Sequence, residues 1–214
     1  MYFIKGATVN VLDKRQILCS LSADDTSGLV LELGCGSSKR VPEAIGVDAQ
    51  DYDCVDIVGD VFAVLRQVPS MSVNAVYSFH FFEHIPDLAG LLDEVARVLK
   101  KGGKLEIVVP HFSNPYFYSD YTHRTFFGLY SMSYFASDSL FSRKVPTYGK
   151  VISYELVDVD LLFKSPKPFY FRYGIKKLIG ALFNLNGYMK ELYEENFCYF
   201  FPCYEIRYSL KKLG

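Results

Sequence analysis

The sequence lacks the features that mark several large classes of protein. It has five cysteines, and none forms a C-x-x-C pair or lies beside a histidine at the spacing of a metal site. No uncharged apolar run reaches about 18 residues and the first residues have no signal-peptide core, so we expect a cytoplasmic protein with reduced thiols. A net charge of −1 gives no general attraction to polyanions, so we expect no nucleic acid partner.

Length and periodicity favour one α/β domain that covers residues 1–214. With 50% hydrophobic and 22% charged residues, a chain of 214 residues is long enough for one well-packed core. Strand-like apolar runs alternate with helical connections, which predicts a parallel sheet with ligands at the carboxyl ends of its strands. The clearest helix spans residues 88–99, with Asp87 as its cap and the glycines at 102–103 at its end. Residues 104–109 follow as a strand.

The most informative segment is the apolar run at residues 29–33, which is followed by a turn with two glycines. Gly34 and Gly36 tolerate positive φ and carry no Cβ, so backbone N–H groups there can approach a polar ligand. A dinucleotide fingerprint needs a third glycine where this chain has Lys39. Glu32 would repel a diphosphate, while it suits a ligand with an ammonium group. The loop therefore predicts a nucleotide cofactor, and an NAD-dependent enzyme is the weaker alternative.

The segment from Glu32 to Gly36 resembles motif I of class I S-adenosylmethionine-dependent methyltransferases, and three further family motifs follow in order. They are a strand that ends in Asp48, a run that ends in Asp60, and residues 75–85, which resemble the fourth strand with its H-x-L-E-H-I exit. The resemblance covers roughly residues 29–110 and implies S-adenosylmethionine as the cofactor. It assigns Asp48 to the ribose hydroxyls and Asp60 to the adenine amino group. The cofactor-binding residues that it implies are Glu32, Gly34, Cys35, Gly36, Asp48, Asp60, Val61, Phe79 and His80.

The same resemblance implies an α/β fold with a doubly wound, Rossmann-like, seven-stranded sheet that is mostly parallel with an antiparallel last strand. Residues 151–163 and 203–210 fit its last two strands. The chain departs from the pattern in one place. Gly34 and Asp48 are 48 − 34 = 14 residues apart, against about 20 in a dinucleotide-binding unit. We therefore expect a loop or a single turn in place of the first helix.

Two segments rich in aromatic residues, at about 111–150 and 165–202, lie outside the bare fold. The first enters beside the cofactor and is the expected wall of the substrate site. The second contains an amphipathic stretch at 169–183. This stretch predicts either core packing with a homodimer contact, or a peripheral contact with a membrane surface or a partner. Its basic residues are Arg172, Lys176 and Lys177.

All four histidines lie between positions 80 and 123. Methyl transfer to a hydroxyl needs a group with a pKa near about 6.5 to remove a proton, so His123 and His111 are the competing bases. Asp120 is placed to fix the tautomer of His123, and Arg124 is placed to bind an anionic group. Tyr116 belongs to the aromatic wall that would contact the substrate.

Residues 119–127, together with 110–113, resemble a D-x-T-H-R/K-x-F-F pattern of small methyltransferases associated with bacterial surface-polysaccharide synthesis. This resemblance implies a small-molecule substrate, methylated on a hydroxyl of a sugar or sugar nucleotide. Two alternatives are another small acceptor methylated at O or N, and a catalytically silent cofactor-binding partner subunit. We expect no resident metal, although Asp120, His123 and His111 carry ligands that would suit Mg²⁺ or Mn²⁺ if they converged.

Overall fold

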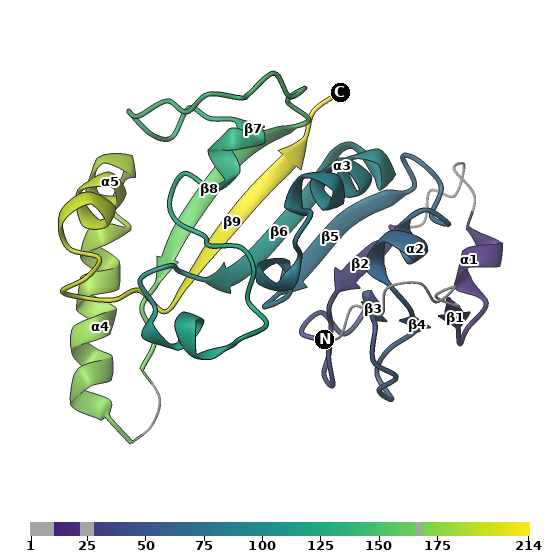
Figure 1. Cartoon of the computed structure of the whole chain (residues 1–214), viewed down its shortest axis with the longest axis horizontal. Coiled ribbons are helices and arrows are strands. Elements are labelled where there is room, and N and C mark those ends of the chain that lie inside the picture. The colour runs from purple at the N-terminus through teal and green to yellow at the C-terminus, as the bar shows by residue number, and fades with distance from the viewer. Residues whose placement is uncertain (1–10, 22–27, 166–167) are drawn as a thin grey trace.

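One mixed sheet of nine strands organises the described part of the chain (Figure 1). The structure is a computed structural model and describes residues 11–21, 28–165 and 168–214. The strands are β1 (Leu12–Asp13), β2 (Val30–Leu33), β3 (Ile45–Asp48), β4 (Ile57–Val58), β5 (Val73–Phe79), β6 (Leu99–Pro110), β7 (Ala136–Ser137), β8 (Tyr154–Leu162) and β9 (Glu205–Lys212). The helices are α1 (Ile17–Ser20), α2 (Val61–Leu65), α3 (Leu88–Val98), α4 (Tyr170–Phe183) and α5 (Gly187–Asn196), with 3₁₀ turns η1 (Phe82–His84), η2 (Pro115–Ser119) and η3 (Met132–Tyr134).

The strand order is β1-β4-β3-β2-β5-β6-β9-β8-β7. Neighbouring strands from β4 to β6 are parallel, and β9 is antiparallel to both β6 and β8. The two edge strands, β1 and β7, have two residues each and add to the predicted seven. The predicted Rossmann-like α/β sheet with an antiparallel last strand is therefore confirmed.

The two faces of the sheet differ in polarity, because successive side chains of a strand point to opposite faces. One row that runs in register across β2, β5, β6, β9 and β8 is apolar and buried: Leu31, Val76, Leu105, Leu210 and Leu156. The adjacent row on the opposite face is polar: Glu32, Tyr77, Glu106, Ser209 and Asp158. Buried side chains of α2, α3 and residues 127–141 form one core with the apolar row.

The connections from β2 to β3 and from β3 to β4 explain the polar face. Residues 34–44 contain no helix, as the short spacing predicted, and residues 49–56 contain none either. Right-handed connections in this direction cross the face opposite to α2 and α3. Because neither connection carries a helix over that face, its residues need not be apolar.

The boundary between α3 and β6 differs from the prediction. Asp87 caps α3 as expected, since its carboxylate accepts the N–H of Gly90 at 2.9 Å. The predicted end of the helix is wrong, because Leu99 already pairs with Val73 as the first residue of β6. The glycines at 102–103 lie inside that strand. Strand pairing with β5 satisfies the backbone of Leu99 and still buries its side chain, so it wins over one more helical turn.

The two aromatic insertions occupy different places. The first covers the apolar face, where Phe127, Leu129, Met132 and Phe141 are buried. The second forms α4 and α5 at the outer edge of β8 (Figure 1), and its Asn184 pairs with the backbone of β8. Core packing of α4 is confined to its end, because only Phe183 is fully buried. None of the described helices is long and apolar enough to cross a membrane.

Candidate functional site

A cavity of about 370 Å³ opens at the carboxyl ends of β2 and β5. Its lining residues that the sequence predicted are Glu32, Gly34, Cys35, Gly36, Phe79 and His80. Its other lining residues are Ser37, Ser38 and Arg40. The remaining predicted cofactor residues, Asp48, Asp60 and Val61, do not line it. The cavity therefore lies where the glycine loop and the exit of β5 meet.

Both glycines of the loop have left-handed backbones, with φ of 68° at Gly34 and 58° at Gly36. A Cβ on Gly34 would lie 2.3 Å from the ring of Phe81, whereas a Cβ on Gly36 would meet no atom within 4 Å. The N–H groups of Gly34 and Gly36 donate to Val47 O and to Asp48 Oδ2, each at 2.8 Å. The expectation that these two N–H groups face a ligand is therefore wrong, because β3 uses them to hold the loop. A ligand in the cavity can still come close to the backbone of the loop at Gly36, where no side chain is in the way.

Two buried or half-buried carboxylates hold the loop in place. Glu32 accepts the N–H of Arg40 at 3.0 Å and that of Val41 at 2.8 Å. Asp48 accepts the N–H of Gly36 and, through its other oxygen, that of Gln50 at 2.8 Å. A carboxylate has about four acceptor positions, so both retain capacity for a ligand.

Three predicted cofactor residues have side chains that serve the fold. Asp60 caps α2 by accepting the N–H groups of Phe62 and Ala63, both at 3.1 Å. The side chain of Val61 lies in the core. Burial raises the pKa of Cys35 to about 12, so its thiol stays protonated and is no nucleophile. Any contact of Val61 with a cofactor would come from its backbone.

His80 is the residue of the cavity wall at which strain and charge coincide. Its φ of 56° lies in the left-handed region. Its Nε2 is 3.1 Å from Glu205 Oε1, and its Nδ1 is 3.6 Å from Glu83 Oε1. The hydrogen bond to Glu205, and then the Glu83 carboxylate, raise the pKa of His80 to about 9 although burial opposes this. His80 is therefore positively charged at pH 7, and such combinations are typical of functional sites.

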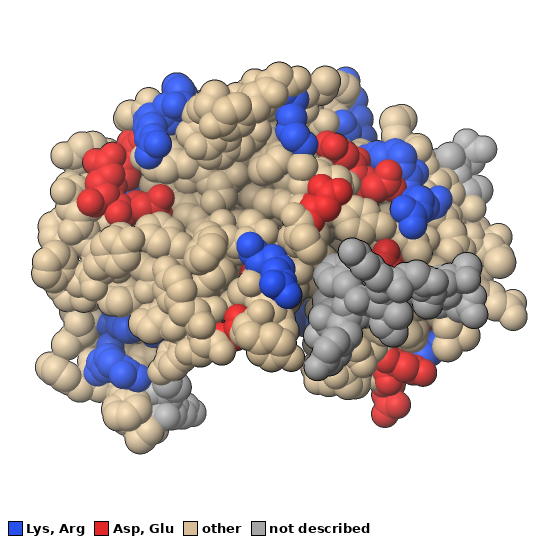
Figure 2. Space-filling model, viewed as in Figure 1, with Lys and Arg blue, Asp and Glu red and all other residues tan. Residues whose placement is uncertain are grey.

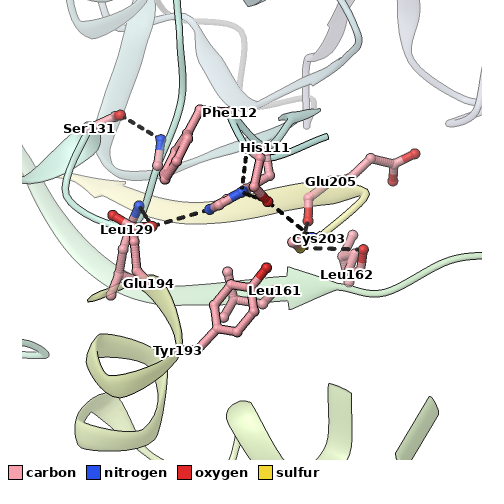
Figure 3. A network of polar contacts seen from close by, with 12 residues as sticks. His111, Phe112, Leu129, Ser131, Leu161, Leu162, Tyr193, Glu194, Cys203 and Glu205 are labelled. Atoms are coloured by element: carbon pink, nitrogen blue, oxygen red, sulfur yellow. Dashed lines mark hydrogen bonds and ion pairs between the residues drawn. The ribbon is translucent and has the colours of Figure 1, made fainter. Parts of the chain in front are cut away.

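His111 is fully buried beneath the first insertion (Figure 3). Its Nδ1 accepts the N–H of Ser113 at 3.1 Å, so Nε2 carries the hydrogen and donates to Glu194 Oε2 at 3.1 Å. The same Glu194 oxygen accepts the N–H of Leu129 at 2.6 Å. Both ring nitrogens of His111 are thus occupied, and the network joins the end of β6 to α5. This arrangement favours an ordering role for His111 over the role of a base.

His123 and Asp120 lie on the turn that follows η2. His123 Nε2 is 3.6 Å from Asp120 Oδ2, which is too long for the hydrogen bond that the sequence suggested. The tautomer of His123 is fixed by the backbone instead, because its Nδ1 lies 2.8 Å from Phe117 O. Hydrogen bonds from the hydroxyl and then the N–H of Thr122 lower the pKa of Asp120. Asp120 therefore acts on His123 by charge alone.

A second cavity of about 230 Å³ lies between the first insertion, α4 and the segment before β9. Three cationic side chains line it, Lys164, Arg172 and Lys176, together with the predicted Tyr116. Burial, and then the neighbouring Arg172, lower the pKa of Lys176, as expected for cations held close together. Arg124, which was predicted to bind an anion, does not line this cavity and lies on the turn of His123.

The two cavities are connected by one buried carboxylate. Glu205, the first residue of β9, bonds His80 through Oε1 and Lys164 through Oε2. His80 lines the first cavity and Lys164 lines the second. These bonds lower the pKa of Glu205 although its burial opposes this. Three bonded side chains, His80, Glu205 and Lys164, therefore link the walls of the two cavities.

Sequence reasoning missed several residues of these sites, and four of them have charged side chains. Arg40 lies with its guanidinium 4.9 Å from the ring centre of Phe79 on the wall of the first cavity. The others are Lys164, Glu194 and Glu205. Only Glu205 had a usable signal, namely the polar residues that alternate along the last strand. The partners of Lys164 and Glu194 come from segments far away in the sequence, so no local pattern reports them.

The sheet order, the glycine loop and the cavity at the carboxyl ends of β2 and β5 define a methyltransferase with a Rossmann-like fold. The family described as a methyltransferase domain matches residues 12–140, and the chain belongs to it. The protein is accordingly an enzyme, an S-adenosylmethionine-dependent methyltransferase.

Solved structures with the same fold support this assignment. An S-adenosylmethionine-dependent methyltransferase from Archaeoglobus fulgidus is 18% identical, with a TM-score of 0.53 and 86% of each chain covered. Phosphoethanolamine N-methyltransferase 2 of Haemonchus contortus, in complex with S-adenosylmethionine, is 16% identical with a TM-score of 0.51. That match covers 87% of this chain and 49% of the Haemonchus contortus protein. At these identities the likeness shows the fold. No curated protein sequence matches the chain.

Proposed function

We propose that the protein transfers the methyl group of S-adenosylmethionine to a hydroxyl of a phosphate-bearing sugar, such as a sugar nucleotide of cell-surface glycan synthesis. The second cavity carries this proposal, because it is cationic and because Glu205 bonds both Lys164 on its wall and His80 on the wall of the cofactor cavity. Arg172 and Lys176 suit the phosphate oxygens of such an acceptor. Tyr116, at the rim, suits the apolar face of a sugar ring. The glycan assignment itself comes from the resemblance of residues 119–127.

The reaction needs an acceptor oxygen held in line with the methyl group and a way to remove its proton. The oxygen attacks the methyl carbon while the carbon–sulfur bond breaks, so the sulfonium becomes a neutral thioether and the hydroxyl proton must leave. We assign activation of the hydroxyl to His123, with Asp120 supplying negative charge beside it. His111 takes no part in this step, since its nitrogens are occupied. Arg124 has an exposed side chain and is a candidate for a second anionic group.

A screen of sugars, sugar phosphates and sugar nucleotides, with mass detection of one added methyl group, tests the proposal. Two adjacent lysines give a matched pair, because Lys176 lines the cationic cavity and Lys177 does not. We expect Lys176→Gln to raise KM for a phosphorylated acceptor about 10-fold, the effect of losing one charged hydrogen bond, with kcat little changed. Lys177→Gln should leave KM unchanged. A preferred acceptor without phosphate, or equal effects of the two changes, would contradict the proposal.

We further propose that α4 contacts an anionic membrane surface, which would bring lipid-linked acceptors to the cationic cavity. In Figure 2 the side of the molecule that carries α4 and α5 shows Lys and Arg at its lower end, while Asp and Glu gather at its upper end, over α5. Residues 168–183 include no acidic residue. The large exposed apolar side chains of α4 are Tyr170, Phe171, Tyr173, Ile175, Leu178 and Leu182. Basic and apolar residues together, without acids, suit anionic headgroups.

Sedimentation with vesicles tests the contact of α4. We expect the protein to bind vesicles that contain anionic lipid, less so at high salt, and not to bind neutral vesicles. Phe171→Ser with Leu178→Ser should abolish binding, whereas Tyr148→Ser removes an equally exposed aromatic ring elsewhere and should not. The alternative occupant is a second copy of the chain. A dimer in light scattering that the α4 changes convert to a monomer would overturn the membrane assignment.

A further inference from the structure

Three side chains with metal-binding atoms converge beside the cofactor cavity. Glu83 and His84 lie on η1, and His123 lies on the turn that follows η2. One carboxylate oxygen of Glu83 and one ring nitrogen of each histidine all lie within 4.8 Å of one another. The ring centres of the two histidines are 4.9 Å apart. The backbone holds the two segments together, since Glu83 O accepts the N–H of Arg124 at 2.7 Å.

The hydrogen bonds of both histidines leave the same nitrogen available. Nδ1 of His123 must donate, because its partner Phe117 O can only accept. The Thr122 hydroxyl gives its hydrogen to Asp120 Oδ1 at 2.6 Å, so it accepts from Nδ1 of His84 at 2.9 Å. In each ring Nε2 therefore carries a free lone pair. Histidines that bind metals are oriented in this way, with the other nitrogen donating to a carbonyl or to a partner held by a carboxylate.

The buried carboxylate of Glu83 points to a missing ligand. Its side chain is 1% exposed, and neither of its carboxylate oxygens has a hydrogen-bond partner among the described residues. The nearest positive group is Nδ1 of His80 at 3.6 Å, beyond hydrogen-bond range. A buried carboxylate normally has such partners, because its desolvation is costly. A cation bound between Glu83 and one ring nitrogen of each histidine would satisfy it.

We propose that Glu83, His84 and His123 bind a divalent cation, with Asp120 at the edge of the site. Two nitrogens and a carboxylate suit first-row ions such as Zn²⁺, Co²⁺ or Mn²⁺. Bonds to such ligands are about 2.0–2.2 Å long, so each ligand atom moves inward by less than about 1 Å. Three protein ligands leave coordination positions open, as in catalytic sites.

The role of the cation rests on the proposed function. An acceptor hydroxyl that occupies an open position has a lowered pKa and loses its proton more easily. The proton passes to the half-exposed carboxylate of Asp120, which lies 3.6 Å from His123 Nε2, and then to water. The oxygen forms its bond to the methyl carbon as the carbon–sulfur bond breaks, giving the methyl ether and S-adenosylhomocysteine. His123 then activates the hydroxyl as a ligand of the cation. The cofactor is close, because His80 lies between Glu83 and the first cavity.

Cation binding is measured without any acceptor, so its outcome is independent of the proposed function. Chelator-treated protein is titrated with Mn²⁺ by electron paramagnetic resonance and with Co²⁺ by visible absorption. We expect one ion per chain, a Co²⁺ spectrum with nitrogen ligands, and an affinity at least tenfold weaker in Glu83→Gln and His123→Gln. Two controls should bind like the wild type: Glu43→Gln, an exposed acid, and His111→Asn, the histidine outside the cluster.

Thermal unfolding guards against a variant that fails to fold. Glu83→Gln removes a buried charge that forms no hydrogen bond among the described residues and only a long ion pair with His80, at 3.6 Å, so the metal-free variant should still unfold cooperatively, close to the temperature of the metal-free wild type. Mn²⁺ should raise that temperature in the wild type and not in Glu83→Gln. Equal cation binding by the wild type and His123→Gln would overturn the inference. Equal binding by Glu83→Gln and Glu43→Gln would overturn it as well. Full turnover of chelator-treated enzyme would overturn the role of the cation in the reaction, while leaving the proposed function standing.

Discussion

The two glycines of the loop give the sharpest test of the cofactor cavity, because they differ in what a methyl group would meet. In Gly34→Ala the new Cβ would lie 2.3–2.5 Å from three atoms of the buried Phe81, on a backbone with φ of 68°. The left-handed backbone costs about 1–2 kcal/mol and the overpacking about 1–3 kcal/mol. We expect a loss of about 2–5 kcal/mol, a large part of the stability of an ordinary domain.

Gly36→Ala should behave differently. Its Cβ meets nothing within 4 Å, and φ is 58°, so the cost is the backbone term of about 1–2 kcal/mol, partly offset by the stiffer unfolded chain. Gly36 also lines the cavity. If the cofactor approaches this backbone closely, the methyl group should weaken binding of S-adenosylhomocysteine at least tenfold, or about 1.4 kcal/mol. The variant should therefore fold and bind poorly.

Urea unfolding and titration calorimetry with S-adenosylhomocysteine separate the two effects. Adding Phe81→Leu to Gly34→Ala should recover little of the lost stability, because leucine keeps the Cβ and Cγ atoms that lie 2.4 and 2.3 Å from the new methyl group. Phe81→Leu in the wild type measures the cost of the change itself. Normal affinity in a folded Gly36→Ala would refute the reasoning, since it would place the cofactor away from the loop. An unfolded Gly36→Ala would contradict the open space around that residue.

Two further predictions concern the histidines. His111→Asn should destabilise the protein by about 1.5–3 kcal/mol in urea, because it removes a buried hydrogen bond to a charged group. We expect kcat of the folded fraction to stay within a few-fold of the wild type. A stable variant without turnover would restore His111 as the base. The ion pairs of His80 with Glu205 and Glu83 raise its pKa from 6.5 to about 9, so the stability they give is fully present below about pH 6.5 and lost as pH rises through about 9. The urea midpoint should fall across that range in the wild type and less in His80→Gln, and parallel curves would show that the pair contributes nothing.

The fold could be predicted from local patterns because each element carries its own signal. The β2 loop, the short 34–44 connection and α3 all follow from hydrophobic spacing and glycine placement. The boundary at Leu99 could not be read in this way, because helix and strand both bury that residue and only the pairing with Val73 decides. Residues at which tertiary pairing competes with local periodicity are the ones that sequence reasoning misplaces.

The candidate site divides along the same line. Residues that line the first cavity come from two strand exits with recognisable motifs, so six of them could be named in advance. The role of His111 could not, because its partner Glu194 lies 83 positions away on α5. The same holds for His84 and His123, which are 39 positions apart in sequence, 123 − 84, and yet share one cluster with Glu83. The sequence does not show whether both, one or neither of the ring nitrogens of a histidine is free to bind a ligand.

The missing first helix changes the electrostatics of the cofactor loop, and this ties the sequence signal to the ligand. In a dinucleotide-binding unit the helix after the first strand directs its positive N-terminus at a pyrophosphate. Here residues 34–44 contain no helix, and the carboxylates of Glu32 and Asp48 hold the loop instead. The loop after β2 is therefore held by two negative carboxylates, where a dinucleotide-binding unit has the positive N-terminus of a helix. At the loop itself that exchange favours a cofactor with a sulfonium and an ammonium group over a diphosphate, and it acts against the positive charges of Arg40 and His80 elsewhere on the cavity wall. The missing helix therefore explains both observations. No third glycine is needed to pack a helix against the strand, and no helix N-terminus is present to bind a pyrophosphate.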